Sequence, residues 1–313
     1  MSLTLVYRGP LASCNYGCEY CPFAKRRDDR AALARDRRAL ARFVGWIAAE
    51  TTRELSVFFT PWGEALVRSW YRDAIVTLSH LAHVSRVAIQ TNLSAPLRFL
   101  EQADRTKVGL WCTYHPEWTT RERFVARVHD LAASGVSHSV GVVGLRRHFS
   151  EIEALRAALP ASTYLWVNAV KSHGGGEPYT EDDVAFLTRV DPLFSFNRVH
   201  HPSRGRSCLT GERVVSVDGD GVVRRCHFVD QAIADLYEPG SLDRALRPRP
   251  CPNATCGCHI GYVHLEDLDL YRTYGDGVLE RAPAAPLIEL GRRANARSSS
   301  RCGPSPAFET PLR

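Results

Sequence analysis

Short apolar segments alternate with amphipathic segments over the first two thirds of the chain. The apolar segments have the length of β-strands, and in each following segment apolar residues recur three or four positions apart, the spacing of one helix face. This pattern predicts six strands, at residues 3–7, 55–59, 87–90, 108–113, 137–144 and 163–170. It also predicts helices at residues 36–50, 67–81 and 96–102, and three more that carry Phe124, Ile152 and Val184. Alternating strands and helices are typical of a parallel sheet whose strands are connected by helices.

Six strand-helix units occupy the first 195 residues, whereas a closed barrel of eight units needs about 250. We therefore predict an α/β fold with a partial (β/α)6 TIM-type barrel over residues 1–195. In barrels of this kind the chemistry lies at the carboxyl ends of the strands. The residues that follow each strand are the first candidates for a functional site.

The pattern changes after the barrel. Two β-branched segments, at residues 214–217 and 222–225, flank the turn sequence Asp218-Gly219-Asp220-Gly221 and predict a β-hairpin. Five cysteines accompany this hairpin, and we predict a small, cysteine-rich auxiliary domain over residues 196–268.

The last part of the chain gives little signal. Residues 282–313 are rich in Ala, Pro, Ser and Arg without periodicity, and they contain the isolated Cys302. We predict residues 269–313 to be a C-terminal tail that is partly disordered.

Composition narrows the classes of function. The net charge is +6, but the basic run from Lys25 to Arg38 is interleaved with aspartates and has few aromatic residues, so nucleic acid is not the expected partner. No segment has the pattern of a membrane span or a signal peptide, which predicts a cytoplasmic protein without a membrane partner. The ten cysteines cluster at spacings typical of metal ligands, which favours metal binding over disulfides.

Three of these cysteines follow the first predicted strand. Cys14, Cys18 and Cys21 have the spacing C-x3-C-x2-C. A 4Fe-4S cube normally takes four thiolates, so a loop with three can hold a cube and leave one iron open for a substrate or cofactor. A zinc loop or three buried thiols is the alternative.

This loop, with the aromatic Tyr20 directly before its last cysteine, resembles the signature of the radical SAM superfamily. The resemblance implies that the open iron binds the amino and carboxylate groups of S-adenosylmethionine and that Tyr20 packs against the adenine. It further implies reductive cleavage of S-adenosylmethionine to a 5'-deoxyadenosyl radical, which takes a hydrogen atom from the substrate. The three cysteines would be the catalytic cluster ligands of an oxidoreductase or transferase.

The second predicted strand is followed by Thr60-Pro61-Trp62-Gly63-Glu64. This segment is similar to the Gly-Gly-Glu motif with which radical SAM enzymes hold the amino group of the cofactor. Gly63 would allow close backbone approach, and the Glu64 carboxylate would accept hydrogen bonds from the ammonium. Trp62 departs from the family pattern.

Polar residues also end the later strands. The family resemblance suggests contacts to S-adenosylmethionine from Thr91 and Asn92 after strand three, Thr113 and His115 after strand four, and Asn168, Lys171 and His173 after strand six. Each is equally compatible with an ordinary loop residue. Cys112 is a candidate hydrogen-atom donor, although a single cysteine is more often a small apolar core residue.

The second cysteine set comprises Cys208, Cys226, Cys251, Cys256 and Cys258. The predicted hairpin brings the first two to its open end. With the downstream group they resemble the SPASM/twitch domain, which implies a second iron-sulfur cluster, of the 4Fe-4S type, with four of the five as ligands. We favour Cys208, Cys226, Cys251 and Cys258, with Cys256 as the alternate. A structural zinc ribbon is the alternative, and the nearby His227, His259 and His264 are either ligands or structural residues.

The substrate is not specified by these motifs. The resemblance favours a peptide or protein substrate, with a sugar, nucleoside or cofactor precursor as the alternative, and implies a low-potential electron donor such as flavodoxin or ferredoxin. A zinc-containing nucleic-acid-binding protein is the non-enzyme alternative.

Overall fold

The computed structural model describes residues 2–24, 26–171 and 178–284. The predictions for Lys25, His173 and Cys302 therefore concern residues outside the described ranges. Within these ranges the dominant feature is a sheet with the strand order β10-β9-β8-β1-β2-β3-β4-β5-β6.

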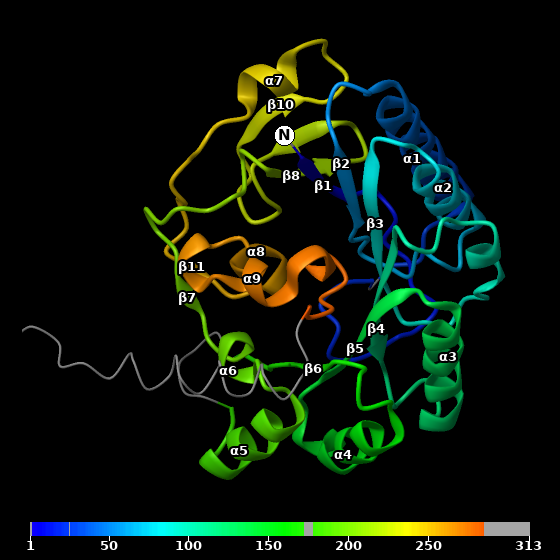
Figure 1. Ribbon diagram of the computed structural model, residues 1–313, viewed down its shortest axis with the longest axis vertical. Helices are drawn as coiled ribbons and strands as arrows, with labels where there is room; N and C mark the ends of the chain where they lie inside the picture. Colours follow the sequence, from blue (N-terminus) through cyan, green and yellow to red (C-terminus); the bar gives the residue numbers. More distant parts are fainter. Residues whose placement is uncertain (1, 25, 172–177, 285–313) are drawn as a thin grey trace, which may run out of the picture.

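Six neighbouring strands of this sheet are parallel and follow chain order, as predicted. They are β1 (Leu3–Arg8), β2 (Leu55–Phe59), β3 (Val84–Thr91), β4 (Val108–Tyr114), β5 (Ser137–Val143) and β6 (Leu165–Asn168). The sheet curves, and the helices that connect its strands cover its convex face (Figure 1). The prediction of an α/β partial barrel is confirmed.

The connecting helices are α1 (Arg30–Ala49), α2 (Ser69–Ser79), α3 (Arg121–Ser134), α4 (Phe149–Ala158), α5 (Glu181–Val190) and the short α6 (Phe194–Asn197), with a 3-10 turn at Arg146–His148. The short helix predicted at residues 96–102 is present as a 3-10 helix at Arg98–Glu101. One predicted boundary needs correction. Helix α1 begins six residues before the predicted start because the Asp29 side chain caps it by accepting a hydrogen bond from the backbone N–H of Ala32.

Alternation of side chains along the strands produces two separate cores. The outer core lies between the sheet and the helices and includes Leu40 and Phe43 of α1. The inner core fills the concave side of the sheet, where Phe58 and Trp111 pack against Tyr262 and other residues of the C-terminal third. The elements of the C-terminal third that form this inner core lie within the curve of the sheet (Figure 1). They are α8 (His259–Tyr262), α9 (Leu270–Tyr274) and the 3-10 turns Glu266–Leu268 and Gly275–Gly277.

The predicted hairpin is present as β8 (Val214–Asp218) and β9 (Val222–Arg224), followed by β10 (Ala232–Asp235) and α7 (Ser241–Ala245). Its turn is fixed by the Asp218 carboxylate, which accepts from the backbone N–H groups of Asp220 and Val222, and by Gly221 at a φ of 95°. Strand β8 pairs in parallel with β1, so the hairpin extends the barrel sheet. A separate two-stranded sheet joins β7 (His201–Pro202) to β11 (Thr255–Cys256).

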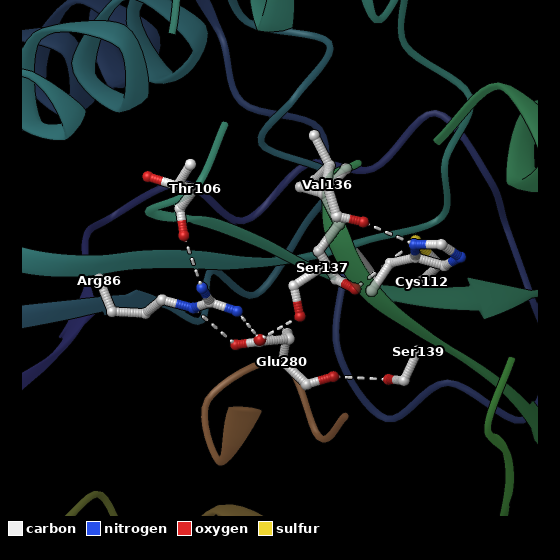
Figure 2. A network of polar contacts seen from close by, with 9 residues as sticks. Arg86, Thr106, Cys112, Val136, Ser137, Ser139 and Glu280 are labelled. Atoms are coloured by element: carbon white, nitrogen blue, oxygen red, sulfur yellow. Dashed lines mark hydrogen bonds and ion pairs between the residues drawn. The ribbon is translucent and has the colours of Figure 1, made fainter. Parts of the chain in front are cut away.

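The described start of the predicted C-terminal tail packs against the barrel. Described residues 269–284 are folded, and Glu280 and Arg281 are buried. Figure 2 shows Glu280 between Arg86 of β3 and Ser137 of β5, bound to both, with its backbone carbonyl accepting from Ser139. The segment thus closes the amino-terminal end of the barrel interior. Short helices and a charged Glu-Arg pair give no hydrophobic periodicity, so the sequence pattern does not identify this segment as core.

Candidate functional site

The loop between β1 and α1 carries Cys14, Cys18 and Cys21. Its first residues are held by Asp28, whose Oδ2 accepts from the backbone N–H groups of Ala12 and Ser13 at 2.9 and 2.8 Å. A turn closes its end, where the Cys21 N–H donates to the Cys18 carbonyl at 3.2 Å. The loop is therefore held at both ends by local hydrogen bonds.

Polar groups surround the loop thiols. Cys14 Sγ accepts from the Tyr16 backbone N–H at 3.4 Å and from Asn92 Nδ2 at 3.8 Å. Burial raises the pKa of Cys14 to about 11, and the neighbouring Cys18 and Cys21 thiols contribute to that rise. N–H donors aimed at a cysteine sulfur are the contacts that orient cluster ligands and stabilise their negative charge.

The donor set fits an iron-sulfur cluster. Three thiols in one loop, each available to a different iron, with N–H donors at Cys14, are suitable for a cube with one open iron. Across residues 2–24, 26–171 and 178–284, no three His, Cys, Asp or Glu side chains converge closely enough to hold a single metal ion.

Gly63 brings the end of β2 against the cysteine loop. A Cβ atom at this position would lie 1.8 Å from the Ser13 carbonyl oxygen, well inside van der Waals contact. Because the obstructing atom belongs to the backbone, a side chain here would displace the loop. Close packing against the Ser13 backbone therefore requires a glycine at position 63, whereas its predicted role beside the cofactor stays a prediction.

Glu64, the second motif residue, is buried and points toward the end of β3. Its Oε1 accepts from Thr91 Oγ1 at 2.8 Å and from the Leu66 N–H at 3.1 Å, and its Oε2 accepts from the Asn92 N–H at 2.6 Å. Burial raises the pKa of Glu64 to about 7, opposed by these three bonds. A carboxylate has about four acceptor positions, so about one is left for another donor.

Asn92 links β3 to the cysteine loop. Its Nδ2 donates to Asn15 Oδ1 at 3.0 Å as well as to Cys14 Sγ, and Asn15 in turn donates to Ser94 Oγ at 3.0 Å. Asn15 and Ser94 were missed by the sequence analysis. An asparagine inside a cysteine loop has no spacing signal that separates it from a turn residue.

Tyr20 and His115 form the other side of the loop. The Tyr20 hydroxyl lies 2.8 Å from His115 Nδ1, and the two rings stack with centroids 6.0 Å apart. The same nitrogen lies 3.4 Å from Cys18 Sγ. Burial lowers the pKa of His115 to about 4, so this histidine is neutral at physiological pH.

The remaining predicted cofactor contacts do not join this network. Thr113 lies at the end of β4 and Asn168 at the end of β6, where alternation along each strand directs them to the inner side of the sheet, as it does Trp111 and Trp166. Cys112 points the other way, into the helix-facing core, where it is fully buried. That position agrees with the core alternative for Cys112.

Two of the auxiliary cysteines, Cys208 and Cys256, pack in or against the inner core. The negative charges of Cys208 and Cys251 contribute to a raised pKa at Cys226, about 11, which is caused mainly by burial. Burial also raises the pKa of Cys256 to about 12, with contributions from Cys258, Cys226 and Cys208. Cys256 is thus electrostatically coupled to both hairpin cysteines.

Cys258 has different neighbours. Burial raises its pKa, while the cations Lys171, Arg8 and Arg281 lower it. The charges near these two cysteines therefore do not favour Cys258 over Cys256 as the fourth ligand. The preference for Cys258, with Cys256 as the alternate, stays a prediction. Two of the nearby histidines contact tyrosine hydroxyls: His259 lies 3.3 Å from the Tyr262 hydroxyl, and His264 lies 2.9 Å from the Tyr271 hydroxyl. The choice between ligand and structural roles for the histidines stays a prediction.

Arg8 and Thr60 form a link between the barrel and the auxiliary region that the sequence did not predict. Arg8 Nε donates to the Thr60 carbonyl at 2.8 Å, and its guanidinium lies 4.1 Å from the centroid of the Trp62 ring. Thr60 Oγ1 lies 3.0 Å from His227 Nε2, next to Cys226. A single arginine or threonine at a strand end carries no motif.

Comparison with known proteins identifies the fold. No family model matches the sequence, and no curated protein matches it. Among solved structures, native anSMEcpe with bound AdoMet has a TM-score of 0.52 and 12% identity, with 96% of this chain and 98% of that chain covered. Native anSMEcpe with AdoMet and the Kp18Cys peptide has a TM-score of 0.52 and 11% identity over the same shares.

anSMEcpe is an anaerobic sulfatase-maturating enzyme, a SPASM radical SAM enzyme. At 11–12% identity the likeness shows a shared fold, and it covers nearly the whole of both chains. This chain therefore shares the overall fold of anSMEcpe, in agreement with the predicted α/β partial barrel. No helix among the described residues has the length and apolar character needed to cross a membrane.

Proposed function

We propose that this protein is a radical SAM enzyme that carries a 4Fe-4S cluster on Cys14, Cys18 and Cys21 and a second iron-sulfur cluster in the auxiliary region. The observation that carries the proposal is the three-thiol loop packed against Gly63 and hydrogen-bonded to Asn92, at the carboxyl ends of parallel strands in a fold shared with an AdoMet-bound radical SAM enzyme. When bound, cluster and S-adenosylmethionine together supply a 5'-deoxyadenosyl radical after one-electron reduction.

The protein's own residues would position these groups. The three cysteines hold the cluster, and Gly63 and Asn92 fix the loop that carries them. Glu64 keeps the ends of β2 and β3 together, and its remaining acceptor position is suited to the amino group of S-adenosylmethionine. Tyr20 would pack against the adenine, and Thr91, Thr113 and Asn168 would contribute polar contacts at the strand ends.

The test is anaerobic reconstitution with iron and sulfide, followed by incubation with S-adenosylmethionine and a strong reductant. We expect 5'-deoxyadenosine from the wild type and none from a variant with Cys14, Cys18 and Cys21 changed to Ala. Iron should fall from about eight to about four per chain in the variant, as loss of one four-iron cube requires. Cys112→Ala is the matched control and should keep both iron and cleavage, because its thiol lies in the helix-facing core. Fully loaded protein that forms no 5'-deoxyadenosine would contradict the proposal.

For the substrate we propose a peptide or protein side chain. The support is the fold shared with anSMEcpe, which has been solved with bound peptides. In the cell, a low-potential donor such as flavodoxin or ferredoxin would supply the electron, and the reaction would take place in the cytoplasm.

A polypeptide that co-purifies anaerobically should change mass under turnover conditions with the wild type and not with Cys14→Ala. An unchanged mass, together with 5'-deoxyadenosine formation stimulated by a small-molecule fraction, would contradict the peptide proposal and favour a sugar, nucleoside or cofactor precursor.

A further inference from the structure

Two cations at opposite edges of the parallel barrel lie near the segments that carry the auxiliary cysteines, Lys171 by a direct contact and Arg8 through Thr60. Lys171, three residues beyond the end of β6, donates from Nζ to the carbonyl oxygen of Gly257. Gly257 lies between Cys256 and Cys258. The Lys171 ammonium is therefore held at the turn that joins these two cysteines.

Arg8 is the last residue of β1 and is connected to the auxiliary region through Thr60. Its Nε binds the Thr60 carbonyl, and the hydroxyl of the same threonine contacts His227, which directly follows Cys226 in the chain. Lys171 thus contacts an auxiliary segment directly from the last strand of the parallel barrel, and Arg8 is connected to another through Thr60 from the first strand.

Neither cation has an acidic partner in the part of the chain that the structure describes. Each has a backbone carbonyl as its hydrogen-bond partner, and each lies over an aromatic ring, Arg8 over Trp62 and Lys171 over Tyr262. Burial lowers the pKa of Lys171 to about 8, opposed by Cys258 and Cys256, and lowers the pKa of Arg8 to about 10, opposed by Cys258. Both side chains are partly buried. Partial desolvation of a cation is unfavourable unless negative charge lies near it, and the cysteines supply that charge when they are thiolates.

We propose that Lys171 and Arg8 raise the reduction potential of the auxiliary iron-sulfur cluster by placing two positive charges beside its cysteine segments. This inference rests on the auxiliary cluster of the proposed function. Reduction adds one negative charge to a cluster, and a fixed positive charge nearby stabilises the reduced form more than the oxidised form. The two residues act through the cluster ligands and are positioning residues.

The experiment isolates the auxiliary cluster by using the full chain with Cys14, Cys18 and Cys21 changed to Ala. After anaerobic reconstitution, the midpoint potential is measured by redox titration, with the paramagnetic signal of the reduced cluster as the readout. Lys171→Gln keeps a hydrogen-bond donor for Gly257 and removes the charge. We expect its potential to be more negative, with the ratio of reduced to oxidised cluster falling about tenfold at fixed potential, which is about 59 mV for a one-electron couple.

Companion variants separate charge from packing. Arg8→Gln should shift the potential in the same direction, and Lys171→Arg should restore most of the wild-type value because it keeps the charge. Arg38→Gln removes an exposed charge on α1 and should leave the potential unchanged, since solvent screens it.

Two results would overturn the inference in different ways. An unchanged potential in Lys171→Gln and Arg8→Gln, with about four irons still bound per chain, refutes the inference alone and leaves the proposed function intact. Failure of the triple alanine protein to load iron removes the auxiliary cluster, and with it both the inference and that part of the proposed function.

Discussion

Gly63 controls how closely the end of β2 approaches the cysteine loop. Because the Cβ of an alanine would meet the Ser13 carbonyl oxygen at 1.8 Å, Gly63→Ala should displace the loop and prevent loading of the first cluster. We expect iron to fall from about eight to about four per chain, with the auxiliary cluster retained.

Gly45→Ala is the control for this variant. Gly45 lies within α1, and a Cβ there meets no atom within 4 Å. Alanine should therefore keep all the iron and stabilise the protein by about 0.5–1 kcal/mol, because glycine is unfavourable inside a helix. Full iron loading in Gly63→Ala would contradict the role assigned to Gly63.

Glu64 should make stability depend on pH. Its pKa is about 7 in the folded protein, raised by burial from the ordinary glutamate value of 4.5, so the folded state binds a proton that the unfolded state has released between these two values. The free energy of unfolding should therefore fall by about 3 kcal/mol as pH rises through this window and should not change further above it.

An infrared titration of the protonated carboxyl band measures this directly. The wild type should lose a band with a midpoint near pH 7, and Glu64→Gln should lack that band. If the carboxylate also accepts a bond from the amino group of S-adenosylmethionine, the added cofactor should lower the midpoint. Identical titrations of the wild type and Glu64→Gln would show that Glu64 is already ionised at low pH.

For single residues, the sequence indicated which residues lie near the cysteine loop better than it indicated which side chains contact one another. Cys14, Gly63 and Asn92 could be placed together because each follows a parallel strand, and such strands end at one edge of the sheet. The pairing of Glu64 with Thr91 could not be predicted, because it depends on side-chain direction at a loop. Arg8 was missed because one cation at a strand end has neither spacing nor periodicity.

Among the elements, the segment from α9 to Arg281 shows how a charged sequence becomes core. Glu280 has no exposed side-chain surface and pairs with Arg86, whose side chain is 15% exposed. Gly109 makes room for this carboxylate, since a Cβ there would lie 2.6 Å from Glu280 Oε2. The strands could be predicted from apolar periodicity, but this segment has none, and its position is fixed by polar contacts to β3 and β5.

A double-mutant cycle tests this buried pair. Glu280→Met should destabilise the protein by about 3–5 kcal/mol because it leaves Arg86 without its partner. Arg86→Met combined with Glu280→Met should cost clearly less than the sum of the two single changes, because no unpaired charge remains. The measurement is anaerobic urea unfolding.

The exposed pair of Arg206 and Asp267 supplies the comparison, with side chains 41% and 43% exposed. Asp267→Asn should change stability by no more than about 1 kcal/mol. Additive costs at Arg86 and Glu280 would show that the two side chains do not act as a pair.

Across the whole molecule, the barrel and the hairpin share one sheet. The sequence predicted a boundary at residues 195 and 196 because the strand-helix alternation stops there. It could not predict the partner of β8, since the pairing of β8 with β1 joins segments about 200 residues apart and no local pattern encodes it. The C-terminal third also fills the concave side of the barrel, so its packing and its strand pairing both link it to the first third.

We therefore expect β1 and β8 to unfold as one cooperative unit. Native-state hydrogen exchange should give the backbone amides of Leu5 and Val215, which are register partners, the same free energy of opening and the same dependence on urea. Strand β10 is the internal reference, because it lies at the edge of the sheet and its residues are partly or fully exposed, so its amides should exchange through smaller openings. If the amides of β8 instead open at lower free energy than those of β1, with a smaller urea dependence, the auxiliary region is an independent folding unit that only docks on the barrel.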